Sequence, residues 1–340
     1  MSRCLWFLKP ALPLLLVCTA APTLAQDLRL ATWNIQTLTT GKKVFPDQVF
    51  VRAQADLDFL ANFATGIAAD VIALQEIASP AAAAQVFPIA QWTICISGQF
   101  FEAYPALGHA PQADCFGTAP LPDTPASEPL ARQFTALAVR KSAGLTVSVS
   151  DLAQLGILHR DKDGQDRAVR WGLLASVQTA SRTFTLLNVH LKSGCFHDRL
   201  SIPLPPPPST RDCDTFARQV PLLDNFVRST PKPFVLLGDF NRNLDLDGDQ
   251  VFERLTGSDT PGTPDSTGLR RFPSHKPSIC FPEPPSDYHY VPIDYFLISD
   301  GLRGRGYLEM SPPIPAGIGA GDFKKKFSDH CPKSLAVQVQ

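Results

Sequence analysis

Residues 234–241 read Phe-Val-Leu-Leu-Gly-Asp-Phe-Asn, an apolar run that ends in a polar turn. A short run of aromatic and branched apolar residues is typical of a strand that is buried on both faces. Asp239 and Asn241 then stand where this strand ends. Taken singly, such residues are best interpreted as a turn or a helix cap. Their meaning therefore depends on what stands at the ends of the other strands.

Similar apolar runs recur along the chain and predict five further buried strands. These strands are expected at residues 28–33, 71–74, 184–189, 293–298 and 335–339. Two helical patterns lie between them: one has Ala55, Phe59 and Phe63 on a single face before Gly66, and the other has Phe216, Val220, Leu223 and Val227 before Pro231. Because strands and helices alternate without a linker, we expect one α/β domain over residues 27–340. Loops rich in Pro, Gly and Ser are expected at 97–130, 195–212, 256–288 and 311–326.

The composition is that of a folded, nearly neutral protein. Of the 340 residues, 44% are hydrophobic and 19% are charged, and the formal net charge is -1. These values exclude a disordered polymer. They also exclude a surface that holds nucleic acid through overall positive charge, so any contact with a polyanion has to be local.

The first 25 residues have the three zones of a secretory signal peptide. Arg3 and Lys9 precede or border an apolar run at 11–17, and small residues end at Ala25. We expect cleavage after Ala25 and a secreted or periplasmic protein. An N-terminal membrane anchor is less well supported because the run is shorter than the roughly 20 residues that span a bilayer. A lipoprotein is disfavoured because Val17 precedes Cys18.

Removal of the signal peptide leaves six cysteines, an even number in an exported chain. The spacing favours the pairs Cys95–Cys115 and Cys195–Cys213, which close short loops, and leaves Cys280–Cys331 as the third. The alternative is a zinc site with Cys195, His197 and Cys213, but the usual zinc-ligand spacing is missing.

Polar residues stand at the ends of several predicted strands. Strand ends are where ligands collect in α/β architecture, so these side chains could converge in one pocket. Asn34, Glu76, Asp239 and Asp329 offer oxygen ligands for a hard divalent cation, namely Mg²⁺, Mn²⁺ or Ca²⁺. Histidines near such a cation suit proton transfer, and the combination is what phosphodiester hydrolysis requires. The histidines and a lysine in this position are His190, Lys192 and His330.

Six short motifs, in order, resemble those of the endonuclease/exonuclease/phosphatase superfamily of DNase I type. They cover residues 32–332, nearly the whole expected mature chain. The ordered set is far more specific than any member alone. The motifs are Thr32-Trp33-Asn34-Ile35, Leu74-Gln75-Glu76, Asn188-Val189-His190-Leu191-Lys192, Gly238-Asp239-Phe240-Asn241, Ile293-Asp294-Tyr295 and Ser328-Asp329-His330-Cys331-Pro332.

This resemblance implies a four-layer α/β sandwich in which two mostly antiparallel sheets pack together and are flanked by helices. It also implies roles for single residues. Asn34, Glu76 and Asp329 would hold the metal, while Asp239 and Asn241 would orient water and phosphate. Asp294 would orient His330, the candidate for the base side of the reaction, and His190 would serve the acid side. Arg170, with Arg167 as a competitor, and Lys192 would contact phosphate.

Two departures from the family pattern stand out. Gln36 occupies a position where some relatives carry a second acidic ligand, so one metal is favoured over two. No motif supplies the carboxylate that relatives pair with the first histidine, and Glu102 is a conceivable partner.

Two other charged segments have more than one interpretation. The stretch 245–249 suggests a calcium loop but lacks the EF-hand spacing, so helix capping by Asp247 or Asp249 is preferred. Residues 324–326, three lysines, either steer a polyanion or form a solvated turn.

The function expected from these features is a secreted, divalent-metal-dependent phosphodiesterase, with nucleic acid as substrate and an endonuclease acting on DNA or RNA as the preferred form. Neither a stable membrane anchor nor a protein partner is indicated. One alternative is a phospholipid or sphingomyelin phosphodiesterase that contacts membranes through Phe100-Phe101 or residues 312–315. Another is a secreted binding protein without catalysis.

Overall fold

The computed structural model describes residues 27–45, 48, 51–200, 204–257, 266–278, 280, 291–314 and 317–339. The expected signal peptide and parts of three expected loops lie outside these residues. The described chain forms a seven-stranded sheet, a six-stranded sheet and a separate two-stranded arm. In both large sheets the neighbours are antiparallel, except for the parallel pairs β1–β2 and β10–β11.

The seven-stranded sheet has the order β14-β15-β1-β2-β5-β3-β4. Its strands are β1 (Leu28–Leu38), β2 (Val71–Ile77), β3 (Trp92–Ile96), β4 (Asp114–Phe116), β5 (Phe134–Arg140), β14 (Leu302–Glu309) and β15 (Lys333–Val339). The six-stranded sheet has the order β12-β13-β11-β10-β9-β6. Its strands are β6 (Thr146–Leu152), β9 (Gly172–Gln178), β10 (Thr183–His190), β11 (Phe234–Asp239), β12 (Arg270–Phe272) and β13 (Asp294–Ile298). The arm consists of β7 (Leu158–Arg160) and β8 (Asp166–Ala168).

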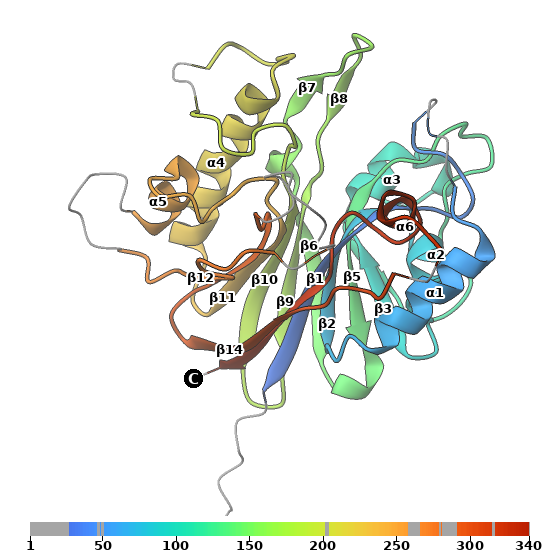
Figure 1. The fold of residues 1–340 in the computed structure, drawn as a ribbon, viewed down its shortest axis with the longest axis horizontal. Helices are drawn as coiled ribbons and strands as arrows, with labels where there is room; N and C mark the ends of the chain where they lie inside the picture. The colour runs from blue at the N-terminus through green and yellow to red at the C-terminus, as the bar shows by residue number, and fades with distance from the viewer. Residues whose placement is uncertain are drawn as a thin grey trace, which may run out of the picture.

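Helices cover the outer faces of the two sheets (Figure 1). One apolar core joins the seven-stranded sheet to α1 (Gln54–Thr65), α2 (Pro80–Ala84), α3 (Gln99–Ala103) and α6 (Ala320–Lys326). A second core lies between the sheets, and a third joins the six-stranded sheet to α4 (Asp212–Ser229) and α5 (Gln250–Thr256). This arrangement confirms the expected four-layer α/β sandwich of two mostly antiparallel sheets.

The six expected strands correspond to β1, β2, β10, β11, β13 and β15, and the two expected helices to α1 and α4. Helix α1 buries Leu57, Leu60 and Ala64 and is followed by Gly66 as expected. Helix α4 continues through Pro221 and ends before Pro231. The predicted apolar face of α4 is buried as expected. In α1 the buried face is instead Leu57, Leu60 and Ala64, while Phe59 and Phe63 are partly buried and Ala55 is exposed, which corrects the predicted face.

Three of the four expected loops contain regular structure, which corrects the prediction. The segment 97–130 includes α3 and β4, 256–288 includes β12, and 311–326 includes α6. Glycines at the start of α6 disfavour a helix locally. The helix nevertheless forms because Phe323 and Phe327 pack against Phe59 of α1. The three lysines at 324–326 lie in the last turn of this helix, where their positive charge interacts favourably with the helix dipole.

The three expected disulfides are present, namely Cys95–Cys115, Cys195–Cys213 and Cys280–Cys331. The first joins the paired strands β3 and β4. The second uses both sulfurs that the alternative zinc site would need, so that alternative is wrong. The third joins the segment at Cys280 to the residue that follows His330.

Phe100 and Phe101, the first candidate for a membrane-contacting projection, lie in the core with 0% and 2% exposure. Among the described residues, no helix combines the length and apolarity needed to cross a bilayer.

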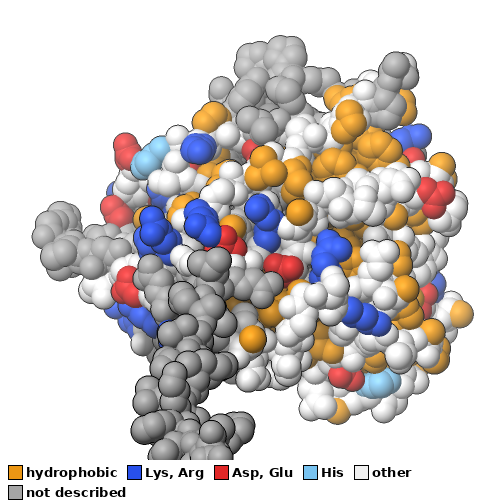
Figure 2. Space-filling model, turned by 90° about the horizontal axis from the view of Figure 1, so that it is seen from below, with side chains coloured by type: hydrophobic (Ala, Val, Ile, Leu, Met, Phe, Trp, Pro, Cys, Tyr) orange, Lys and Arg blue, Asp and Glu red, His pale blue; other side chains and the backbone are white. Residues whose placement is uncertain are grey.

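Figure 2 shows the molecule from below, at the end of the sheets where β1 begins. On the visible part of this face, basic side chains stand among apolar ones, with acidic side chains beside several of them.

Candidate active site

The site lies where the two sheets meet at the ends of their central strands. Asn34 comes from β1 of one sheet and Asp239 from β11 of the other. Asn34 Nδ2 donates a hydrogen bond to Asp239 Oδ2 at 2.9 Å and another to Glu76 Oε1 at 3.2 Å. This amide therefore links the carboxylates at the ends of β2 and β11. The predicted convergence of strand-end residues is confirmed for these three.

A bulge between β1 and β2 directs Glu76 toward this junction. The register between the strands shifts after Asn34, and Gln36, Thr37 and Glu76 all have positive φ angles. Such angles are costly for residues other than glycine and persist where surrounding contacts fix them. Here Thr37 N donates to Glu76 Oε2 at 3.0 Å, and Gln133 Nε2 donates to the same oxygen. Glu76 is thus held in place while remaining partly accessible.

Asp239 is buried at the centre of the site. Its Oδ1 accepts a hydrogen bond from Asn241 N at 2.8 Å, and its Oδ2 lies 3.5 Å from His190 Nε2 and 3.8 Å from His330 Nε2. The preceding Gly238 has φ +135°, and a Cβ there would lie 2.1 Å from the carbonyl oxygen of Val189. Glycine is therefore required for β10 and β11 to approach closely enough to bring Asp239 to both histidines.

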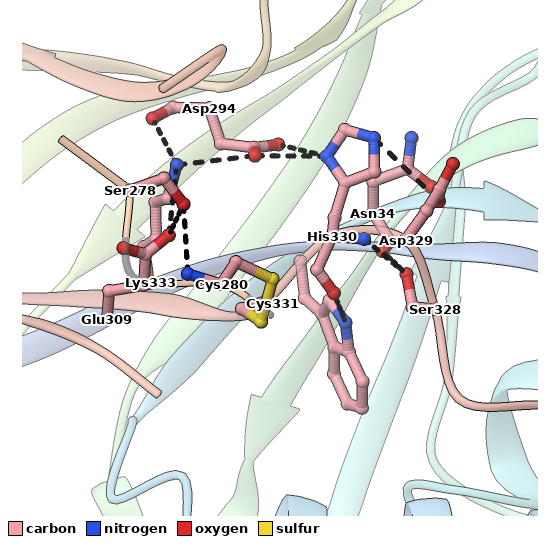
Figure 3. Close-up of a disulfide and its surroundings, with 11 residues drawn as sticks. Asn34, Ser278, Cys280, Asp294, Glu309, Ser328, Asp329, His330, Cys331 and Lys333 are labelled. Carbon is pink, nitrogen blue, oxygen red and sulfur yellow. Dashed lines mark hydrogen bonds and ion pairs between the residues drawn. A yellow bond between two sulfur atoms is a disulfide. The ribbon is translucent and has the colours of Figure 1, made fainter. Parts of the chain in front are cut away.

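The Asp294 carboxylate contacts the ring of His330 (Figure 3). Its Nδ1 lies 3.2 Å from Asp294 Oδ1 and 3.0 Å from Oδ2. Ser328 Oγ donates to the Asn34 carbonyl at 2.7 Å and accepts from His330 N at 3.0 Å. The segment that carries His330 is thereby fixed to β1, and Nε2 of the ring is left facing Asp239.

His190 also lies near Asp239 Oδ2, and its ring contacts an arginine. Arg170 Nε donates to His190 Nδ1 at 3.2 Å, and Nη2 lies 2.6 Å from Nε2. Arg167 instead pairs with Asp161 and Asp163 on the arm. Of the two candidate arginines, Arg170 is therefore the one at the site.

The two histidines are pushed toward opposite charge states. Burial lowers the pKa of His190 well below its usual value, and the nearby charge of Arg170 lowers it further. Burial also opposes the charged form of His330, but the carboxylates of Asp294 and Asp239 raise its pKa well above the usual value. Burial raises the pKa of Asp239 to about 7, with His330 opposing this rise and Asp294 adding to it. Such shifts are characteristic of groups that exchange protons.

Three predicted residues lie outside this centre. Lys192 Nζ pairs with Asp212 Oδ1 at 2.6 Å rather than extending toward Asp239. Asp329 is 53% exposed at the rim, with Oδ1 4.0 Å from His330 Nε2. Glu102 is exposed on α3, and the carboxylates recorded near His190 are those of Asp239 and Glu76. Glu102, a conceivable partner of His190 from the sequence, is therefore not the carboxylate beside that histidine.

The donor set fits a hard divalent cation. Single ligand atoms of Asp239, Asp294 and His330 lie within 4.8 Å of one another. Two further carboxylates lie at the edges of this cluster, Glu76 at 3.9 Å from His190 Nε2 and Asp329 at 4.0 Å from His330 Nε2. The pKa of Asp239 is raised because burial disfavours its negatively charged form, and a cation bound nearby would stabilise that form. Asn34 turns its Oδ1 to the backbone of Gln36 and its Nδ2 to the carboxylates. Carboxylate oxygens are the ligands that Mg²⁺ and Mn²⁺ prefer.

Arg52 and Lys333 also shape the site, although they belong to none of the six motifs. Arg52 is partly buried, and this burial lowers its pKa to about 10. Its guanidinium donates to carbonyl oxygens on both sides of the site, including Gln36 at 2.6 Å and Phe327 at 2.7 Å. It thereby ties the bulge of β1 to the segment before His330. Lys333 contacts Asp294 from the side that faces away from His330 (Figure 3).

A cavity of about 270 Å³ opens beside His330. Its lining includes Asn241, Asp294, Asp329 and His330, so the pocket is continuous with the reactive centre. Lys333 and the Cys280–Cys331 disulfide form part of its wall. The size is at the lower end of the range for ligand pockets, which is roughly 300–1,000 Å³.

A four-layer sandwich with carboxylates, two histidines and an arginine at one end of its sheets is the architecture of a phosphoester hydrolase of DNase I type. The chain belongs to the endonuclease/exonuclease/phosphatase family, whose model matches residues 31–330. Members of this superfamily hydrolyse phosphoesters and generally use divalent metals. No curated protein sequence matches the chain.

Solved structures share the fold over nearly the whole chain. TDP2 from D. rerio, humanized by 14 mutations, has a TM-score of 0.53 and 12% identity, covering 92% of this chain and 99% of that chain. An endonuclease/exonuclease/phosphatase protein from Bacteroides vulgatus has a TM-score of 0.53 and 13% identity, with coverage of 93% and 100%. A mannosyl-6-phosphatase from Bacteroides thetaiotaomicron has a TM-score of 0.50 and 11% identity, with coverage of 91% and 99%. At these identities the likeness establishes the fold and leaves the substrate open.

Proposed function

We propose that the chain is an exported, divalent-metal-dependent phosphodiesterase that cuts DNA or RNA internally. One observation carries this proposal: Asp239 Oδ2 lies 3.5 Å from His190 Nε2 and 3.8 Å from His330 Nε2. Two proton-transfer groups at one carboxylate match the needs of an in-line displacement at phosphorus, where one proton is taken from water and another is given to the leaving oxygen.

Each residue has a separate task in this reaction. Asp239 and Asn241 orient the attacking water and the phosphate, and the partly buried Arg170 guanidinium offers hydrogen bonds to phosphate oxygens. Asp294 holds the tautomer and ring orientation of His330 through Nδ1, which leaves Nε2 free to exchange a proton.

The order in which the histidines act has two possible forms. The family resemblance assigns the base side to His330 and the acid side to His190. The directions of their pKa shifts favour the reverse, with His330 entering the reaction protonated and His190 neutral. Substrates with different leaving groups distinguish the two assignments, because only loss of the acid is masked by a good leaving group.

Glu76 and Asp329, with Asn34 beside them, are the residues proposed to hold a single Mg²⁺ or Mn²⁺. When bound, the cation would supply charge neutralisation at the phosphate oxygens. Gln36 supports one metal rather than two, because its side chain adds no carboxylate to the site. Glu76 is held by Thr37, Gln133 and Asn34, so little rearrangement is needed for it to act as a ligand.

Three observations bear on the substrate and on export. The burial of Phe100 and Phe101 removes the first candidate for a membrane-contacting surface, which weakens the lipid alternative. The three disulfides support an oxidising compartment, as expected for a protein exported by a signal peptide. The mannosyl-6-phosphatase of the same fold makes a sugar phosphate a necessary comparison substrate.

The substrate class is tested with the purified chain that begins at Gln26. Plasmid DNA, single-stranded RNA, sphingomyelin liposomes and mannose 6-phosphate are each incubated with Mg²⁺, and His330→Ala serves as the control for contaminating enzymes. We expect internal cuts in nucleic acid by the wild type only. Hydrolysis confined to the liposomes or to the sugar phosphate would contradict the nuclease proposal and identify the substrate class instead.

A further inference from the structure

Lys333 is a buried cation on the side of Asp294 that faces away from His330 (Figure 3). It is the first residue of β15 and is 2% exposed. Its Nζ donates to the Asp294 carbonyl oxygen at 3.3 Å and to Oδ2 of the same residue at 3.4 Å. The Asp294 carboxylate therefore has one cationic neighbour on each side, the His330 ring and the Lys333 ammonium.

The far side of Lys333 is occupied by a second acidic residue. Glu309 is paired with Lys333 in the β14–β15 register, and its Oε1 lies 3.6 Å from Nζ. Ser278 Oγ donates to this same oxygen at 2.7 Å and accepts from Cys280 N at 3.2 Å. Cys280 is bonded to Cys331, the residue after His330. The chain of contacts thus begins and ends next to the reactive histidine.

This arrangement has a physical requirement for a cation at position 333. Asp294 and Glu309 are 5% and 4% exposed at their side chains, and with a neutral residue at position 333 both buried carboxylates would lose the cation that they share. Asp294 must also keep its carboxylate directed at His330 Nδ1. An ammonium anchored to Glu309 supplies a fixed donor that holds Asp294 from behind. Without it, protonation or rotation of Asp294 would relieve the unpaired charge.

We propose that Lys333 is a positioning residue that acts through Asp294 to hold the His330 ring in its reactive orientation. The proposal rests on the function proposed above. In the structure Lys333 is separated from His330 Nε2 by the Asp294 carboxylate and the ring itself, so it serves the reaction without a role for its own proton. Glu309 and Ser278 keep the ammonium in place.

The experiment is a double-mutant cycle in the full exported chain, with a fluorescently labelled DNA duplex and Mg²⁺. Lys333→Met is compared with wild type, Asp294→Asn and the double variant. We expect Lys333→Met to lower kcat roughly 10–100-fold, the range seen when a group that supports an active-site ligand is removed, with KM unchanged. In the Asp294→Asn background the same change should cost less than about threefold, because the two residues act as one unit.

Two controls keep the test decisive. Lys232→Met removes another ion-paired lysine, which binds Asp300 next to the start of β11 and away from the site, and should leave kcat unchanged. If circular dichroism shows that Lys333→Met is unfolded, Lys333→Gln takes its place in the cycle, since glutamine keeps a donor but not the charge. Unchanged kcat, a rise in KM alone, or full additivity with Asp294→Asn would overturn the proposal.

A crystal structure of Lys333→Met separates failure of this proposal from failure of the proposed function. We expect the Asp294 carboxylate to leave hydrogen-bonding distance of His330 Nδ1. If wild type cleaves no phosphodiester, the proposed function fails, and the variant structure alone decides the role of Lys333. An Asp294–His330 pair with unchanged geometry in that structure would overturn the positioning role.

Discussion

Asp239 contacts groups from both sheets, and several residues near it have backbone conformations that lower local stability. Asn34 contacts it from the other sheet, and both histidines lie within 4 Å of its Oδ2. Asn241, Gln36 and Glu76 have positive φ angles next to it. Each such angle costs roughly 1–3 kcal/mol for a residue with a side chain, so the surrounding hydrogen bonds must offset this cost.

Replacing either histidine tests the acid–base assignment at this scale. We expect His190→Ala and His330→Ala each to lower kcat by roughly 10²–10⁴ on nucleic acid, the usual contribution of general acid–base catalysis. With bis(4-nitrophenyl) phosphate, whose leaving group needs no protonation, the variant that lacks the acid should recover most of its loss. Equal losses on both substrates for both variants would contradict a division into acid and base.

Gly238→Ala tests the close approach of β10 and β11. The added Cβ would meet the backbone of Val189, which has no room to move without parting the strands. We expect a loss of at least about 2 kcal/mol in the free energy of unfolding, measured by urea denaturation. Gly321→Ala is the matched control, since nothing lies within 4 Å of its Cβ, and helix propensity predicts a neutral or slightly stabilising change. Equal stability of Gly238→Ala and wild type would contradict this account.

The motif residues at this scale could be found from sequence because strand ends concentrate them. Arg52 and Lys333 could not, because their partners are backbone carbonyls or side chains far away in sequence. The residues that neighbour such an arginine or lysine in the sequence do not distinguish it from one that is exposed to solvent. Lys192 illustrates the reverse case: its place in a motif suggested phosphate, while its ammonium pairs with Asp212.

At the scale of elements, helix α5 shows how one carboxylate does two tasks. Asp249 Oδ1 accepts from Val251 N and Phe252 N and so caps the helix, in agreement with the preferred interpretation of residues 245–249. Its Oδ2 pairs with Arg242 Nε at 2.6 Å, and both side chains are buried. Arg242 also donates to the Cys195 carbonyl at 3.0 Å. The cap therefore fixes the segment that follows Asn241.

Asp249→Ala is expected to lower the free energy of unfolding by about 4 kcal/mol, because it removes the cap and leaves Arg242 buried without a counterion. Asp249→Asn keeps a capping oxygen and should lose somewhat less. Asp224→Ala breaks exposed pairs with Arg228 and Arg254 and should cost less than about 1 kcal/mol. Urea denaturation of all three measures these differences, and similar losses for Asp249→Ala and Asp224→Ala would contradict the account.

The packing of β7 on α4 predicts a pH dependence of stability. His159 on β7 is buried against Thr215 of α4. Burial lowers its pKa below the usual 6.5, and Lys192 lowers it further. The unfolded chain then binds a proton more readily than the folded chain. Stability from this group is complete above about pH 6.5 and is lost as the pH falls from there toward the lowered folded-state value.

Urea midpoints for wild type and His159→Gln, measured at about pH 7.5 and about pH 5.5 on either side of the ordinary histidine pKa, test this dependence. We expect the wild type to lose more stability on acidification than the variant does. The opposite order, or equal losses, would show that His159 takes up its proton as easily in the folded chain.

Elements with strong internal patterns were predictable, and elements made by tertiary contact were not. The six buried strands and helices α1 and α4 have clear apolar runs or periodicity. Helix α6 begins with glycines, yet Phe323 and Phe327 pack on α1 and stabilise it. Strands β4 and β12 have three residues each and form by pairing with β3 and β13. Their own residues are too few to carry a pattern.

At the scale of the whole molecule, the site exists only because two sheets pack face to face. The core between them is formed from apolar side chains of both, and Asn34 and Asp239 meet at one end of that core. The four-layer arrangement followed from the ordered motifs rather than from strand patterns alone. A shared fold does not fix the substrate, so the loops around the site are where substrate choice is expected to lie.

The most direct test of the central claim is metal dependence of phosphodiester hydrolysis. The purified chain is treated with EDTA, dialysed, and assayed on plasmid DNA and RNA before and after addition of Mg²⁺, Mn²⁺ or Ca²⁺, with His330→Ala alongside. We predict no cleavage after chelation, recovery with at least one cation, and no recovery in the variant beyond roughly one part in a hundred. Cleavage that persists at the same rate after chelation, or that His330→Ala retains in full, would contradict the account.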